Sequence, residues 1–289
     1  MTRPIAPAAA MFKGANGNML AGDVYGEAGP PVLLLHGGGQ TRHAWKKTGD
    51  LIARMGRAAY AVDQRGHGDS EWVADGAYQY GDFAADARVL ADTLAERSGV
   101  RPAVVGASLG GMAALLAEGG RPKNGTMFSA LVLVDITPRV DIEGVSKIQA
   151  FMRANSREGF GSIAEAADAV AAYLPHRPRP RSHEGLKKNL RLRDGRWYWH
   201  WDPAFMTKPG DDPELRTENF EHAAANLTIP VLLIRGKLSD VVSPEGVRHF
   251  LDTVPNAEFV ELSDAGHTAA GDDNDAFSDV VVKFATRPA

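Results

Sequence analysis

Cysteine is absent from the 289 residues of the chain. Disulfide bonds, thiolate metal sites and a cysteine nucleophile are therefore excluded. No His-Glu-x-x-His or comparable ligand spacing occurs, so we expect neither a metal ion nor a cofactor. Any chemistry must come from hydroxyl, carboxylate and imidazole groups.

Long hydrophobic runs and an excess of charge of one sign are also lacking. No apolar segment approaches the ~20 residues of a membrane span, and the N-terminal segment lacks the bulky apolar run of a signal peptide. The formal net charge is -4, with both signs mixed along the chain, which gives no reason to expect a nucleic acid or membrane partner. We expect a cytoplasmic protein that acts on a small molecule. No motif specifies an oligomeric state.

Short apolar runs bounded by Gly and Pro predict buried strands. They lie at 30–38, 58–66, 101–108, 129–138, 229–236 and 257–264, and helical patterns occupy 80–99, 109–120 and 275–286. Near-continuous Val, Leu and Ile is typical of parallel strands covered on both faces. Asn16-Gly17 inside 11–26 predicts a hairpin. The alternation of strands and helices predicts an α/β fold with helices on both faces of a mostly parallel sheet.

One interval, from about Arg139 to Leu227, contains no predicted strand. Its helical segment at 162–174 and its Pro-rich connectors indicate a mostly helical insertion. We therefore expect a core of residues 1–138 and 228–289 and a cap of residues 139–227. In the aromatic stretch 195–205, Trp199 and Trp201 are candidates for lining or supporting a substrate pocket. Packing of the cap onto the core is the alternative role.

Ser108 stands where a predicted strand turns into a helix, with Gly106 and Gly110 on either side. A sharp strand-to-helix turn strains the backbone and requires small neighbours, and it lifts the serine oxygen to the start of the helix. This pattern predicts a nucleophile. A helix N-cap serine is the structural alternative, but capping does not account for the two glycines.

The remaining parts of an acyl-transfer site follow in the sequence. His36-Gly37-Gly38-Gly39 ends the first strand of the predicted parallel sheet, where glycine backbone amides can approach a substrate. The N–H groups of Gly38 and Leu109 are the predicted oxyanion donors.

The base and the acid come from the last third of the chain. His267, in a loop after the last strand, is the predicted base, and Asp240, after the strand at 229–236, is the predicted acid that orients it. Asp135, at the end of the preceding strand, is the alternative acid.

The motifs "HGGGQTRHAW", "DQRGHGDS", "GASLGG", "LVLVDITP", "RGKLSDVVS" and "AGHTA" stand in one order along the chain. With them, the sequence resembles the α/β-hydrolase fold superfamily, in its cap-bearing branch of serine hydrolases and esterases. The resemblance covers residues 12–284 and implies the triad Ser108, Asp240 and His267. It also implies structural roles for His36 and His67. Serine at the elbow argues against the haloalkane dehalogenases and epoxide hydrolases of this fold, which use aspartate.

The resulting prediction is a carboxylesterase that cleaves small or medium acyl esters through an acyl-serine intermediate. A lactonase or a carbon–carbon bond hydrolase could use the same triad, and both remain open. A perhydrolase and a non-catalytic ligand receptor are less favoured, the latter because all three triad residues are present.

Overall fold

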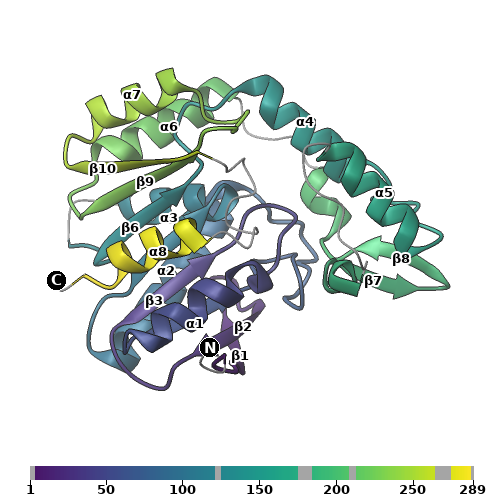
Figure 1. Ribbon diagram of the computed structural model, residues 1–289, viewed down its shortest axis with the longest axis horizontal. Helices are drawn as coiled ribbons and strands as arrows, with labels where there is room; N and C mark the ends of the chain where they lie inside the picture. Colours follow the sequence, from purple (N-terminus) through teal and green to yellow (C-terminus); the bar gives the residue numbers. More distant parts are fainter. Residues whose placement is uncertain (1–3, 121–124, 175–183, 208–212, 264–274, 288–289) are drawn as a thin grey trace.

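An eight-stranded sheet forms the centre of the molecule (Figure 1). The computed structural model describes residues 4–120, 125–174, 184–207, 213–263 and 275–287. The strands are β1 (Ala8–Lys13), β2 (Met19–Tyr25), β3 (Pro31–Leu35), β4 (Ala58–Val62), β5 (Ala103–Ala107), β6 (Ala130–Val134), β9 (Val231–Gly236) and β10 (Ala257–Leu262). Their spatial order is β1-β2-β4-β3-β5-β6-β9-β10. The pairs β1–β2 and β2–β4 are antiparallel and the others are parallel. All six predicted strands and the predicted hairpin are present.

Helices cover both faces of the sheet. Side chains alternate between the two faces along each strand, so a strand of consecutive apolar residues makes both faces apolar, and both must be covered. In β3, Leu33 points into one apolar cluster, and Val32 and Leu34 point into the other. The first cluster includes side chains of α2 (Tyr80–Ser98), α3 (Leu109–Gly119), α6 (Pro213–Ala225) and α7 (Pro244–Thr253). The second includes those of α1 (Lys46–Arg54) and α8 (Asp275–Ala285), which lie in front of the sheet in Figure 1. The predicted mostly parallel α/β architecture is confirmed.

The chain between β6 and β9 leaves the sheet and forms a cap. Figure 1 shows α4 (Ile142–Arg153), α5 (Ile163–Tyr173), β7 (Leu190–Arg193) and β8 (Arg196–Trp199) beyond one end of the core. Short 3-10 helices span Glu184–Asn189 and Pro203–Met206. These elements share an apolar cluster of their own around Met152, Phe160, Trp199 and Trp201. The cap is therefore a separately packed layer.

The prediction that no strand lies between 139 and 227 was wrong, because β7 and β8 pair as an antiparallel hairpin. Asp194 and Gly195 form its two-residue turn, with φ of +48° and +77°. Positive φ at both positions is typical of the Asp-Gly turn that joins twisted strands. The aromatic residues that follow this turn form β8 and the segment after it. The Asp194-Gly195 dipeptide was the sequence signal for this hairpin, and the sequence analysis missed it.

The C-terminal part of the predicted cap belongs to the core. Helix α6 packs on α3, and a β-carbon at Gly119 would come within 1.9 Å of the Ala223 carbonyl oxygen. Phe220 and Ala224 also lie in the larger core cluster. The observed boundary between cap and core therefore falls before α6 and not at residue 227.

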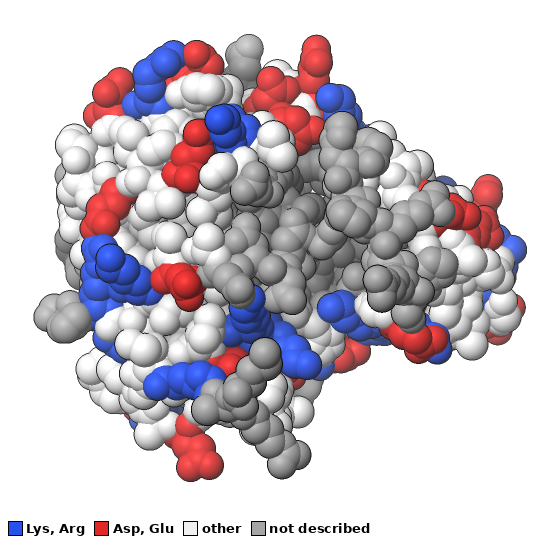
Figure 2. Space-filling model, in the orientation of Figure 1, with Lys and Arg blue, Asp and Glu red and all other residues white. Residues whose placement is uncertain are grey.

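Two features of the structure bear on the expectations about membrane spans and surface charge. No helix in the described ranges is long and apolar enough to cross a membrane. Figure 2 shows acidic and basic side chains interspersed over one face, without a broad field of one sign.

Candidate active site

The turn between β5 and α3 holds Ser108 in an unusual backbone conformation. Its φ is +45° and its ψ is -112°. A residue other than glycine at positive φ is strained, and the surrounding structure must hold it there. Ser108 is partly exposed, so the turn presents its side chain at the surface of the core. The predicted strand–turn–helix geometry is present.

The glycines around Ser108 are required by close backbone approach. A β-carbon at Gly106 would lie 2.5 Å from the Gly110 oxygen, and one at Gly110 would lie 2.4 Å from the Leu35 oxygen. Both distances are far inside van der Waals contact, so any side chain would push β5, α3 and β3 apart. The pattern Gly-x-Ser-x-Gly is thus explained by packing of the turn.

Ser108 does not serve α3 as a capping side chain. Its side chain makes no cap hydrogen bond, while its carbonyl oxygen accepts the helical bond from Met112 N at 3.0 Å. Leu109 is the first residue of α3, and the first N–H groups of a helix have no partner within it. The start of α3 therefore offers a backbone donor beside the serine, where the helix dipole favours negative charge.

The loop after β3 lies directly against this turn. A β-carbon at Gly37 would lie 3.4 Å from the Ser108 β-carbon. Gly38 is partly exposed, and among the described residues its N–H has no hydrogen-bond partner. The structure therefore places the loop of Gly37 and Gly38 beside Ser108 and the start of α3. The roles of Ser108, Gly38 and Leu109 in catalysis stay predictions.

His36 fixes the base of the same loop. Its Nδ1 donates to the Gly37 oxygen at 2.8 Å, and its Nε2 accepts from Gln64 N at 3.0 Å. The Gln64 side chain also donates to the His36 carbonyl at 2.6 Å. Complete burial lowers the pKa of His36 to about 4, so the ring is neutral. These contacts support the structural role that the resemblance implies.

His67 is also a buried, neutral ring. Its Nδ1 donates to the Arg65 carbonyl at 2.9 Å, and burial lowers its pKa to about 3. His67 has no exposed surface and packs edge-on against Phe205. Its position supports an architectural role.

The two candidate acids have very different surroundings. Asp135 directly follows β6 and is 1% exposed, with φ of +49°. Because Ala107 pairs with Val134 in the parallel β5–β6 ladder, the next residues, Ser108 and Asp135, are neighbours at the ends of adjacent strands. The Asp135 carboxylate accepts hydrogen bonds from Gly236 N at 3.0 Å and from Ser239 Oγ at 2.5 Å.

Asp240 instead lies in the exposed loop after β9. Its carbonyl oxygen packs against Gly144 at the start of the cap, where a β-carbon would come within 1.9 Å. No shared strand register brings Asp240 beside Ser108, in contrast to Asp135. The assignment of the acid to Asp240 stays a prediction, and Asp135 has the stronger geometric support.

Trp199 and Trp201 lie inside the cap. They are 4% and 3% exposed, and their rings stack at 4.8 Å with an interplanar angle of 11°. Trp199 also packs on Phe151 and Phe160. Trp201 reaches the core, since a β-carbon at Gly39 would lie 3.4 Å from its ring. Cap packing therefore accounts for Trp199, while Trp201 also supports the glycine loop.

Two other cap side chains cover the glycine loop, and sequence reasoning did not single them out. A β-carbon at Gly38 would lie 3.7 Å from the Phe205 ring and 3.9 Å from Met152 Sδ. Phe205 also packs with Leu109 in one apolar cluster. A lone methionine in a helix carries no local signal of such a contact. Only the cap's fold brings Met152 to the loop.

His267, the predicted base, lies outside the described residues.

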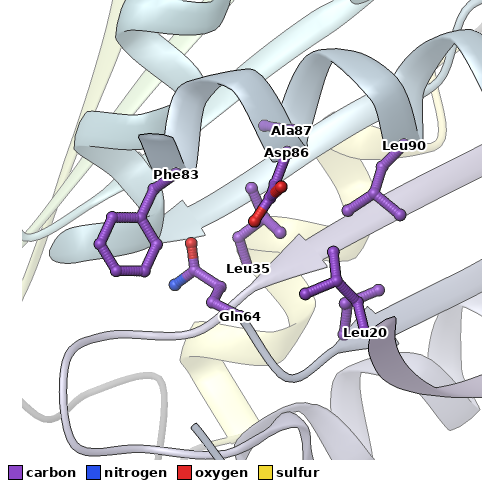
Figure 3. A pocket seen from close by; sticks show the side chains of 8 residues that line it. Leu20, Leu35, Gln64, Phe83, Asp86, Ala87 and Leu90 are labelled. Carbon is purple, nitrogen blue, oxygen red and sulfur yellow. The ribbon is translucent and has the colours of Figure 1, made fainter. Parts of the chain in front are cut away.

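Within the described ranges, no group of three or more histidine or acidic residues is placed to hold a metal ion. A small cavity lies between the sheet and α2 (Figure 3), and neither Ser108 nor Gly38 lines it. It is lined by Leu20, Leu35, Val62, Gln64, Phe83, Asp86, Ala87 and Leu90. Since most of these side chains are apolar and Asp86 is paired with Arg65 at 2.7 Å, the cavity is a gap in core packing.

Comparison with known proteins identifies the class. The sequence profile of the Alpha/beta hydrolase family matches residues 32–280, and the chain belongs to this family. It is 30% identical over 264 residues to esterase Rv0045c of Mycobacterium tuberculosis, covering 89% of this chain and 83% of that protein. It is 27% identical over 248 residues to 2-(acetamidomethylene)succinate hydrolase of Mesorhizobium japonicum, covering 83% and 82%.

Solved structures give the same fold. The crystal structure of E-2-(acetamidomethylene)succinate hydrolase matches with a TM-score of 0.79 at 23% identity, covering 96% of this chain and 98% of that one. A structure of the M. tuberculosis esterase Rv0045c matches with a TM-score of 0.72 at 27% identity, covering 98% and 93%. The predicted fold superfamily is confirmed, and the relatives support the prediction of a hydrolase.

Proposed function

We propose that the chain is a serine hydrolase that cleaves small or medium acyl esters through an acyl-serine intermediate. The observation that carries this proposal is the strained Ser108 turn, set against a glycine loop whose Gly38 N–H has no partner among the described residues. The esterase of M. tuberculosis, at 30% identity over most of both chains, supports ester cleavage.

In the proposed reaction, Ser108 Oγ attacks the ester carbonyl carbon and His267 takes its proton. The carbonyl oxygen becomes an oxyanion that accepts hydrogen bonds from Gly38 N and Leu109 N. Collapse of the tetrahedral intermediate breaks the bond to the alcohol, which leaves with the proton from His267. Water then attacks the acyl-serine in the same way, and the carboxylic acid is released.

We propose Asp135 as the acid that orients His267, in preference to Asp240. Asp135 is buried beside Ser108, and two hydrogen bonds hold its carboxylate. A buried carboxylate fixed in this way selects one histidine tautomer and stabilises the imidazolium that forms during the reaction.

The cap residues on the glycine loop indicate the substrate class. The side chains nearest to the β-carbon positions of Gly38 and Gly39 belong to Met152, Trp201 and Phe205, and these three are apolar. An apolar wall of this kind suits an uncharged acyl group. We therefore propose neutral acyl esters as substrates, without a cofactor.

The test combines a substrate panel with labelling. Turnover of p-nitrophenyl esters of increasing acyl length is compared with turnover of lactones and β-diketones. A serine-reactive phosphonate should block the activity and add its mass to the peptide that contains Ser108. Ser108→Ala should fold normally and lose activity by on the order of 10³-fold or more. Labelling elsewhere, or undiminished turnover by Ser108→Ala, would refute the proposal, and preference for lactones or diketones would assign the alternative chemistry.

A further inference from the structure

We infer that His200, a residue of the cap, is a positioning residue that holds the oxyanion loop in its working geometry. This inference rests on the proposed function, because it assigns a purpose to the Gly38 N–H. It makes the cap a part of the catalytic apparatus through a hydrogen-bond relay.

The His200 ring joins the cap to two core loops. Its Nε2 donates to the Gly39 carbonyl at 3.1 Å, and its Nδ1 accepts from Gly68 N at 2.8 Å. Since a carbonyl can only accept and an amide N–H can only donate, the ring must be the neutral Nε2–H tautomer. Burial holds the pKa of His200 well below its usual 6.5, and the side chain is 1% exposed. Both nitrogens are therefore committed to the backbone.

The Gly39 carbonyl and the Gln40 N–H belong to the same peptide unit, and this N–H makes the next hydrogen bond of the relay. Gln40 N, in the same planar unit, donates to the Gly37 oxygen at 3.1 Å. The Gly37 oxygen in turn belongs to the peptide unit that carries the Gly38 N–H. Because each unit is planar, fixing the direction of its C=O fixes the direction of its N–H. His200 therefore acts on the direction of the Gly38 N–H through Gln40, together with His36, which donates to the same Gly37 oxygen.

Such a clamp is needed because of the loop's composition. Three consecutive glycines at 37–39 restrict the backbone little, and Gly39 has φ of +74°. The Gln40 side chain and His36 anchor the loop at Gly37, by accepting from its N–H at 3.0 Å and donating to its oxygen at 2.8 Å. Among the described residues, His200 is the hydrogen-bond partner that fixes the Gly39 carbonyl.

The segment that carries His200 is itself docked firmly on the core. Asp202 N donates to the Gly66 oxygen at 2.8 Å, and Tyr78 Oη donates to Asp202 Oδ2 at 2.7 Å. A further ion pair between cap and core, from Arg191 in β7 to Asp69 at 2.6 Å, lies outside this segment and is partly exposed, so it contributes little to the docking. The ring is thus delivered to Gly39 from a rigid support.

The experiment separates the two bonds of the ring with a pair of polar variants. His200→Asn keeps an acceptor near the Nδ1 position and cannot reach Gly39. His200→Gln can place its amide N–H near the Nε2 position and donate to Gly39. Arg191→Gln is the control, since it removes a contact between cap and core that does not touch the glycine loop.

We expect kcat for a p-nitrophenyl ester to fall about 10- to 100-fold in His200→Asn, with KM changed less than about 3-fold, because an oxyanion donor acts mainly in the transition state. His200→Gln should retain kcat within about 5-fold, and Arg191→Gln should match the parent. Affinity for a trifluoromethyl ketone that mimics the tetrahedral intermediate should fall with kcat. Equal kcat in His200→Asn and the parent, or an equal loss in Arg191→Gln, would overturn the inference.

The rate of phosphonate labelling of Ser108 distinguishes this inference from the proposed function. Absence of labelling at Ser108 in the parent protein refutes the proposed function. Labelling of the parent at Ser108, with an unchanged rate in His200→Asn, refutes the role of His200 alone. Slower labelling in His200→Asn, restored in His200→Gln, supports both.

Discussion

The hydroxyl of Ser239 donates a hydrogen bond of 2.5 Å to the carboxylate of Asp135, across 104 positions of sequence. Ser239 Oγ is held in turn by the N–H groups of Val241 and Val242, both at 3.2 Å. The loop after β9 therefore holds the carboxylate of Asp135, the residue proposed here as the acid of the triad.

The pair Asp135→Asn and Asp240→Asn decides which carboxylate serves the proposed triad. An amide in the acid position favours the wrong histidine tautomer, so Asp135→Asn should lower kcat by on the order of 10³- to 10⁴-fold. Asp240→Asn should stay within about 3-fold, since Asp240 is exposed in its loop. Both are measured as kcat and kcat/KM on the same ester, with circular dichroism as the control for folding. The reverse pattern would return the acid to Asp240.

Ser239→Ala should lower kcat/KM by about 10- to 150-fold, because a hydrogen bond to a charged group contributes roughly 1.5–3 kcal/mol. Loss of this donor concentrates charge on Asp135, which raises the pKa of the catalytic histidine. The acidic limb of the pH–rate profile should therefore move to higher pH. Ser243→Ala is the matched control, because Ser243 caps α7 through Gly246 N at 3.0 Å and does not contact Asp135. An unmoved acidic limb in Ser239→Ala would contradict the coupling.

Trp199→Ala and Trp201→Ala should differ in their effects. Removing either buried indole costs about 3–5 kcal/mol of stability, so both variants should melt at lower temperature. Only Trp201 contacts the glycine loop, so only Trp201→Ala should also change the preference for acyl-chain length. Melting temperatures and kcat/KM across the ester series measure the two effects. A change in preference in Trp199→Ala would show that Trp199 too acts on the substrate site.

Stability should fall as the pH drops below about 6.5. In the folded protein, burial lowers the pKa of His36 to about 4 and that of His67 to about 3, and it places the pKa of His200 well below 6.5. Between those values and 6.5 the unfolded chain binds protons that the folded chain does not. Each ring then removes up to about 1.4 kcal/mol of unfolding free energy per pH unit.

Urea unfolding at pH 8, 6 and 5 measures this loss. His200→Gln lacks one of the three rings, so its unfolding free energy should depend less steeply on pH. A denaturation midpoint that is constant from pH 8 to pH 5 would contradict the prediction.

The sequence predicted the sheet because its strands are buried on both faces. Near-continuous Val, Leu and Ile in β3, β5, β6 and β9 left no competing helical period. The Ser108 turn was equally readable, because its glycines are required by contacts within a few residues or with the adjacent β3. Local constraints were therefore visible in the local sequence.

Features that depend on distant contacts were harder to predict. Asp135 was predicted only as the alternative acid, since nothing near it in the sequence indicates its hydrogen bond with Ser239. The Asp194-Gly195 dipeptide is a local signal of a hairpin turn, but the aromatic residues beside it were interpreted as a substrate site and not as a strand. His200 is one aromatic among several in the sequence, and its contact with Gly39 spans 161 positions. Such roles arise from the fold and leave no pattern in a single sequence.

The contacts of the 200–202 segment bear on attempts to exchange caps between relatives. A donor cap grafted at the ends of β6 and β9 without counterparts of His200 and Asp202 would leave Gly39, Gly66 and Gly68 without these partners. A chimaera of this kind should bind its new substrate yet turn it over slowly. Transferring the cap together with the loops at 36–40 and 66–69 would keep these hydrogen bonds. The cap and the two loops should therefore be exchanged together, although they are separate in the sequence.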